Sequence, residues 1–212
     1  MRLKACILFA FFILAGCFAE SKETISPENH HSKSAKIKLT PVDLFQGEAA
    51  KFKLFLGPMS GAFKLEYEGS KPNASLDIDI WKNGQKVDSA GSIGDLFSSS
   101  VEQKSSSEVE VIISVDTVSI ERQSEFSTIK VSTVDHSGSS LSTFTIPWDK
   151  KLAARSLIQN TRPQSFTADQ TAHVFGMQAT SANEIHAADL SPESLSKTEW
   201  ALVFTLRFDD EI

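Results

Sequence analysis

Residues 200–208 read Trp-Ala-Leu-Val-Phe-Thr-Leu-Arg-Phe, and this stretch decides the fold. Large apolar side chains stand at every second position from Trp200 to Phe208, which is the period of a β-strand with one buried face. Burying these five side chains contributes roughly 8 to 15 kcal/mol gross to folding. We therefore predict that residues 198–208 form a central strand of a β-sheet.

The same alternation recurs along the chain from residue 36 onward. Asn83-Gly84 adds a strong hairpin signal, because a type I′ turn needs positive φ at both central residues. Gly57-Pro58 and residues 70–73 mark further turns, and residues 89–107 have the Ser-rich and Gly-rich composition of a long loop or a weak edge strand. The alternation predicts strands near residues 36–45, 50–56, 62–68, 75–82, 107–118, 126–134, 140–147, 171–180 and 198–208.

Many short strands with turns between them and few helix signals predict an all-β protein, namely an antiparallel β-sandwich. An immunoglobulin- or fibronectin-like topology is the favoured arrangement, by analogy with other sandwiches rather than from a motif. No internal repeat is visible, and the segment after Trp148 holds too few clear strands to form a second domain. We therefore expect one sandwich domain over residues 36–212.

The composition is that of an ordinary globular protein, with 212 residues of which 41% are apolar and 23% charged. The formal net charge of -6 becomes -8 when the first 16 residues, which include Arg2 and Lys4, are removed. An acidic body disfavours nucleic acid and anionic lipid headgroups as partners, since those contacts are made by Lys and Arg. No phosphate loop or dinucleotide fingerprint follows a strand, so we expect no cofactor.

The first 16 residues have the parts of a secretory signal: a basic start, Met-Arg-Leu-Lys, then an apolar run over residues 5–14 and two small residues. The run is too short to cross a bilayer as a permanent helix. Leu14-Ala15-Gly16-Cys17 closely resembles the lipobox of bacterial lipoproteins. This resemblance implies cleavage before Cys17 and a diacylglycerol thioether on its sulfur. It also implies residence on the outer face of the cell membrane, or on the outer membrane of a Gram-negative host.

The residues after the proposed signal are polar, mixed in charge and without periodicity. Residues 17–35 therefore read as a lipidated N-terminus and a flexible tether. About 19 residues of random coil have an r.m.s. span of roughly 22 to 26 Å, which lifts a domain clear of the headgroups. Cys6 and Cys17 are the only cysteines, so the body after the tether has no thiol for a disulfide or a metal site.

An acidic cluster is the first candidate for chemistry. If residues 62–68 and 75–82 pair as a hairpin, Glu66 faces Asp77, and two like charges directly opposite each other are unfavourable. That arrangement would suit a cation. Pairing residues 50–56 on the other side of residues 62–68, however, places Lys53 beside Glu66, while Lys64 faces Asp79, so the charges compensate. We interpret the cluster as a solvated, salt-bridged face and expect no metal site there.

The histidines do not form a recognisable catalytic or metal pattern. Asp135-His136-Ser137 contains the residue types of a hydrolytic triad. Consecutive residues at a strand end point to opposite sides, however, so the segment is better interpreted as a turn than as a triad. His173 and His186 lack the spacing of a zinc site. We therefore expect no catalytic residue and no metal ligand.

Trp81 and Trp148 are the candidate surface residues for binding, whereas Trp200 belongs to the core by its period. Trp81 shares the strand parity of Asp77 and lies near the Asn83-Gly84 turn, and Trp148 follows Pro147. Exposed tryptophans would form an aromatic platform for a glycan or a partner. Packing at the edge of a sandwich is the favoured interpretation of both.

These features lead to a functional hypothesis with two alternatives. The leading hypothesis is a non-enzymatic, membrane-anchored extracytoplasmic lipoprotein that binds another envelope protein. One alternative is a cell-envelope hydrolase or metal-dependent enzyme whose site brings together His136, His173 or His186 with carboxylates. The other is a lipoprotein that binds a glycan or a small solute in a groove lined by Trp81 or Trp148.

Overall fold

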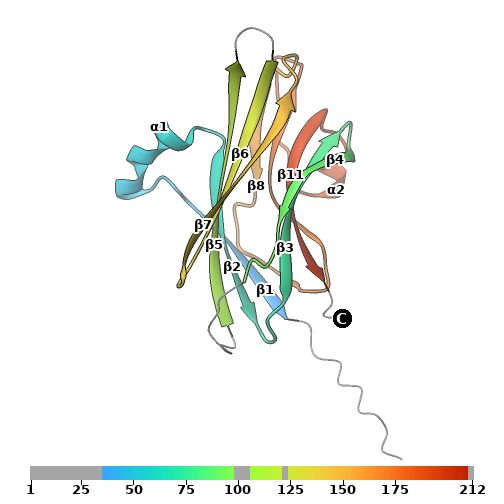
Figure 1. The fold of residues 1–212 in the computed structure, drawn as a ribbon. Coiled ribbons are helices and arrows are strands. Elements are labelled where there is room, and N and C mark those ends of the chain that lie inside the picture. The colour runs from blue at the N-terminus through green and yellow to red at the C-terminus, as the bar shows by residue number, and fades with distance from the viewer. Residues whose placement is uncertain (1–34, 98–105, 121–123, 210–212) are drawn as a thin grey trace, which may run out of the picture. The chain divides into compact units, whose positions relative to one another are not determined.

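The computed structural model describes residues 35–97, 106–120 and 124–209, and these form two antiparallel β-sheets that pack face to face (Figure 1). Sheet A has the strand order β7-β6-β5-β2-β1-β9, and sheet B has the order β4-β3-β11-β10-β8. The predicted all-β sandwich is therefore confirmed, while an immunoglobulin-like topology stays a prediction. Cys17, the proposed signal and the tether lie outside the described residues. Within those residues, no helix is both long and apolar enough to cross a bilayer.

The strands of sheet A are β1 (Lys36–Val42), β2 (Ser60–Glu68), β5 (Ser106–Ile120), β6 (Ser124–Asp135), β7 (Gly138–Trp148) and β9 (Gln164–Thr167). Those of sheet B are β3 (Asn73–Lys82), β4 (Gln85–Ile93), β8 (Ala154–Gln159), β10 (Ala172–Thr180) and β11 (Trp200–Asp209). The short helices are η1 (Gly47–Phe52), α1 (Lys53–Leu56) and α2 (Pro192–Leu195). Residues Ser32–Ile212 form one compact unit.

β11 is a central strand, as its sequence predicts, with β3 on one side and β10 on the other. Its large apolar side chains, among them Leu202 and Phe204, face the core between the sheets. Ala201 and Val203 point the other way and are also buried, in a second cluster with Leu195 of α2. The strand is therefore buried on both faces over most of its length, because the segment between β10 and β11 folds back over sheet B.

The predicted strand at residues 50–56 is wrong, since this segment forms η1 and α1. β1 pairs directly with β2, with Val42 opposite Ala62, so no place for another strand exists between them. Phe52, Leu54 and Phe55 consequently lie exposed instead of facing a core. The segment has the alternation of a strand but no sheet to join.

The predicted hairpin of residues 62–68 with 75–82 is also wrong, because β2 belongs to sheet A and β3 to sheet B. The short link between them crosses from one sheet to the other. Glu66 therefore pairs with Lys38 at 3.1 Å rather than facing Asp77, and Lys64 pairs with Glu108 at 2.6 Å rather than with Asp79. The outer face of sheet A is salt-bridged, as expected, but by different partners.

The Asn83-Gly84 turn joins β3 to β4 as predicted, with φ of 49° and 74° at its two residues. The turn docks on the chain beyond α2: the Asn83 N–H donates to the Glu199 carbonyl at 2.9 Å, and the Gly84 N–H donates to the Thr198 carbonyl at 3.2 Å. A Cβ at Gly84 would lie 2.4 Å from the carbonyl oxygen of Ser196. The contact leaves no room for a side chain.

We expect Gly84→Ala to lower the free energy of unfolding by about 2–4 kcal/mol, because a positive φ is strained for alanine and the new methyl group displaces the backbone at Ser196. Gly47→Ala is the matched control, since Gly47 also has a positive φ, 59°, but has open space around it. The control should lose only about 1 kcal/mol. Urea unfolding measures both, and equal losses would contradict the docking of this turn.

Candidate functional site

The connection between β1 and β2 is longer than its geometry requires. The two strands are antiparallel neighbours, so a short turn could join them, yet the chain takes the 17 residues 43–59. η1 and α1 stand out to the side of sheet A within this connection (Figure 1). Long connections that carry exposed apolar side chains are usually functional rather than structural. We call residues 43–59 the β1–β2 connection.

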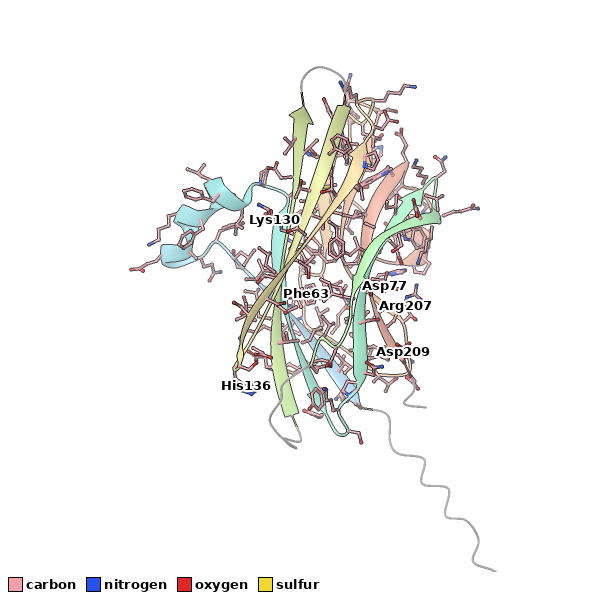
Figure 2. The ribbon with its side chains drawn as sticks, in the orientation of Figure 1. Phe63, Asp77, Lys130, His136, Arg207 and Asp209 are labelled. Carbon is pink, nitrogen blue, oxygen red and sulfur yellow. The ribbon has the colours of Figure 1, made fainter. Side chains whose placement is uncertain are left out.

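A cleft of about 460 Å³ lies at the base of the β1–β2 connection. We call it the edge cleft, because it opens between sheets A and B on the side of β1, β8 and β10. Its apolar walls include Leu39, Phe63, Phe175 and Phe45, and Figure 2 shows Phe63 between the sheets. This volume falls within the range of roughly 300–1,000 Å³ that is typical of ligand pockets.

The rim of the edge cleft is polar and includes an unpaired donor. Asn160 follows β8, and its Oδ1 accepts a hydrogen bond from Gln164 Nε2 at 3.1 Å. Its Nδ2 is buried and has no hydrogen-bond partner among the described residues. A buried donor without a partner costs about 1–3 kcal/mol. Turning this amide toward the cleft to meet an acceptor on a bound ligand would remove that cost.

The cleft also borders an open strand edge. β9 pairs only with residues 36–39 of β1, so residues 40–42 are bordered by β2 alone. Pro41 and Val42 of this free stretch line the cleft. An open edge beside an apolar cleft is the arrangement that extended peptides use when they add to a sheet.

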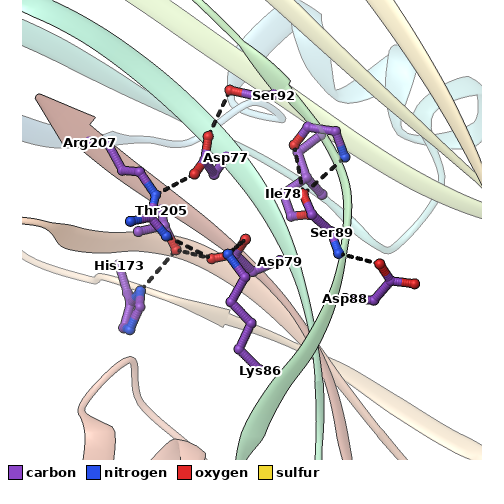
Figure 3. Close-up of polar contacts among 11 residues, drawn as sticks. Asp77, Ile78, Asp79, Lys86, Asp88, Ser89, Ser92, His173, Thr205 and Arg207 are labelled. Atoms are coloured by element: carbon purple, nitrogen blue, oxygen red, sulfur yellow. Dashed lines mark hydrogen bonds and ion pairs between the residues drawn. The ribbon is translucent and has the colours of Figure 1, made fainter. Parts of the chain in front are cut away.

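Sheet B carries a charged cluster on its outer face (Figure 3). The side chain of Asp79 is 2% exposed, and its Oδ1 lies 2.6 Å from Lys86 Nζ. Its Oδ2 lies 3.8 Å from Arg207 Nη2. Arg207 Nε also donates to Asp77, which accepts a second hydrogen bond from the Ser92 hydroxyl at 2.7 Å. Two carboxylates and two cations balance here, so the cluster ties β3, β4 and β11 together.

His173 adjoins this cluster. Its Nδ1 lies 3.0 Å from the hydroxyl of Thr205, which donates to Asp79 at 3.3 Å (Figure 3). Its ring meets that of Trp81 edge-on, with the ring centroids 5.6 Å apart. Burial lowers the pKa of His173; the Asp79 carboxylate acts in the opposite direction, and Arg207 lowers it further. The imidazole is therefore neutral at pH 7.

We expect the stability of the protein to fall as the pH drops below about 6.5, where unfolded His173 takes up a proton and the folded residue does not. The contribution is complete above that pH and is lost as the pH falls toward the lower pKa of the folded state. His173→Gln should weaken this dependence, since glutamine can bond Thr205 without titrating. His186→Gln, at an exposed position, is the control. Urea midpoints at pH 7.5 and 5.5 measure the effect, and identical pH dependence in wild type and His173→Gln would contradict it.

The two tryptophans considered for a binding platform lie elsewhere. Trp148 is 9% exposed and packs edge-on against Trp200 at 5.2 Å, so a surface platform that includes it is wrong. It is buried because β7 turns its even positions inward, as Ile146 also shows. Trp81 is half-buried against the second cluster under α2. Neither residue lines the edge cleft.

The three histidines considered for an enzyme do not converge. His136 lies in the turn between β6 and β7 (Figure 2), His173 on the outer face of sheet B, and His186 in the segment after β10. Asp135 accepts hydrogen bonds from the N–H and hydroxyl of Ser137 at 2.7 and 2.6 Å, which lowers the pKa of its carboxyl and confirms the predicted turn. Among the described residues, no group of three or more His, Cys, Asp or Glu is placed to hold a metal ion.

Comparison with protein-family models, curated proteins and solved structures found no match. The edge cleft and the β1–β2 connection are the candidate functional features. Sequence reasoning missed both, although the apolar residues 52 and 54–56 beside Lys51 and Lys53 were a visible signal.

Proposed function

We propose that this chain is a lipid-anchored, non-enzymatic binding module of the bacterial cell envelope, and that its edge cleft receives an extended segment of another envelope protein. The observation that carries the proposal is the combination of an apolar cleft, an open edge of β1 and the unpaired amide of Asn160. A bound polypeptide would fill the cleft, pair with the open edge of β1 and offer an acceptor to the amide of Asn160.

The proposed mode of binding is strand addition. A segment lying along residues 40–42 would exchange main-chain hydrogen bonds with the free edge of β1 and place alternate side chains in the cleft. An apolar side chain would contact Phe63 and Phe175, and a carbonyl oxygen would accept from Asn160 Nδ2 once this buried amide turns toward the cleft. Pro41 has no N–H, which limits the number of such bonds and favours a short segment.

The proposed location follows from the N-terminal residues. The lipobox-like Leu14-Ala15-Gly16-Cys17 supports lipidation of Cys17 after export. The first strand begins at Lys36, immediately after the proposed tether. A body held by the proposed tether of about 19 residues would reach partners within a few tens of ångströms of the membrane surface.

A small amphipathic solute is the second candidate ligand. The volume of the edge cleft, about 460 Å³, favours it, because that size suits a small molecule as well as a peptide side chain. A glycan is less favoured for this cleft, since sugars stack on aromatic platforms and the two tryptophans lie outside it.

A photo-crosslinking side chain at Thr161, on the rim of the edge cleft, distinguishes these candidates in the full-length lipidated protein in its native membrane. We expect a discrete adduct that contains a second polypeptide. The matched control is the same group at the exposed Ser139 of β7, on the opposite edge of sheet A, which should give no such adduct. Asp43→Trp narrows the rim of the edge cleft. When it is combined with the crosslinking group at Thr161, the amount of adduct should fall at least several-fold. An adduct of small-molecule mass would favour the solute, and equal crosslinking from both positions would refute the cleft as the site.

A further inference from the structure

The tip of the β1–β2 connection exposes large apolar side chains to solvent. Phe52 is 50% exposed, Leu54 94% and Phe55 86%, and the three lie within four consecutive residues. A single exposed apolar residue is ordinary, but a cluster on a projecting element marks an interaction site. We call these three residues the apolar tip.

Two lysines accompany the apolar tip. Lys51 Nζ lies 5.5 Å from the ring centroid of Phe52, and Lys53 Nζ lies 5.7 Å from that of Phe45. Neither lysine forms an ion pair within the described part of the chain. Glu48 is the only acidic residue in η1 and α1, so the tip is locally basic although the body as a whole is acidic.

We propose that the apolar tip inserts into the boundary between headgroups and acyl chains of a bilayer, with Lys51 and Lys53 bound to anionic headgroups. The lysines alternate with the apolar residues of the tip, and a long Lys side chain beside apolar ones keeps its ammonium group at the headgroups while the apolar side chains enter the acyl region. Protein interfaces share the enrichment in Phe, but they also favour Trp, Tyr and Arg and are poor in Lys. The composition Ala-Ala-Lys-Phe-Lys-Leu-Phe-Leu at residues 49–56 therefore fits lipid better than a protein groove.

The length of chain before β1 also supports a bilayer as the partner of the apolar tip. With Cys17 anchored, as the proposed function requires, about 19 residues of tether hold the body within roughly 22 to 26 Å of the membrane on average. The tip then meets the bilayer at a high effective concentration, which strengthens its binding beyond that of the free body. Seating the tip gives the body a defined orientation, with the edge cleft, which shares Phe45 with the β1–β2 connection, close to the membrane surface.

Vesicle binding by the unlipidated body, residues 32–212, tests this directly, because that unit is compact and contains every residue of both apolar clusters. Vesicles of phosphatidylglycerol and phosphatidylcholine are compared with vesicles of phosphatidylcholine alone. We expect binding that is stronger to the anionic vesicles and falls roughly tenfold or more in Leu54→Ser/Phe55→Ser. Val134→Ser/Leu141→Ser, which removes two exposed apolar side chains from β6 and β7, should bind as wild type does. Lys51→Glu/Lys53→Glu should lose only the preference for anionic vesicles.

A second measurement reports insertion itself. The body has no cysteine, so Leu54→Cys introduces a single thiol for an environment-sensitive dye, and Leu141→Cys is the control. When vesicles are added, we expect the fluorescence emission of a dye at position 54 to shift to the blue, and that of a dye at position 141 to stay unchanged. Vesicle binding unaffected by Leu54→Ser/Phe55→Ser, or no shift at position 54, would overturn the proposal. Neither measurement needs a lipid on Cys17 or a partner in the edge cleft, so failure here is distinct from failure of the proposed function.

Discussion

Phe204→Ala is expected to lower the free energy of unfolding by about 3–5 kcal/mol. Phe204 lies fully buried in the middle of β11, paired with Ile78 of β3 on one side and Phe175 of β10 on the other. Its ring meets that of Phe175 edge-on, with centroids 5.6 Å apart. Removal of the ring leaves a cavity bordered by both sheets, which they cannot close without moving apart.

Because a domain of this kind is stable by only about 5–15 kcal/mol, this single change removes a large share of the total. Phe208→Ala is the matched control, since Phe208 lies on the same strand but is only partly buried at its end. The control should lose clearly less of its free energy of unfolding. Urea unfolding of residues 32–212 measures both variants, and a loss below about 1 kcal/mol for Phe204→Ala would show that β11 is not the centre of the core.

Removal of lipidation is expected to transfer most of the protein from the membrane fraction to the soluble fraction. Two acyl chains hold a protein stably on a bilayer, whereas a weak interfacial contact such as the apolar tip does not. The variant combines Cys17→Ser with replacement of residues 1–16 by the signal of a secreted protein, so that cleavage still occurs. Ser21→Ala, within the proposed tether, serves as a control and should stay with the membrane.

Fractionation of cells followed by detection of the body measures this effect. The altered signal is needed because Cys17→Ser alone could leave an uncleaved apolar segment on the chain. Retention of the cleaved Cys17→Ser variant on the membrane would contradict lipid anchoring, and would require another element to hold the body there.

The period of the apolar residues predicts much of this fold and fails at identifiable places. β11 follows from the alternation of Trp200 to Phe208, and the turn after β3 follows from Asn83-Gly84. The predicted hairpin of β2 with β3 is wrong because the link between them, residues 69–72, is as short as a hairpin turn would be, and both strands alternate equally well. Nothing local distinguishes a turn within one sheet from a crossing between two sheets.

The edge cleft could not be predicted from local sequence, because it depends on contacts between distant segments. Its walls come from β1, β2 and β10, and Asn160 reaches it from the end of β8. The exposure of Leu54 depends equally on the pairing of β1 with β2, which leaves residues 50–56 outside the sheet. The burial of Trp148 is different, since its parity with Ile146 on the same strand already indicates an inward position.

The proposed anchoring and place of action require a lipid at position 17. Intact-mass measurement of the protein purified from its native membrane tests this most directly. We predict a chain that starts at Cys17 and carries a diacylglycerol group, with residues 1–16 absent. A chain with an unmodified Cys17, or with a start elsewhere and no lipid, would contradict the proposed anchoring and with it the proposed place of action.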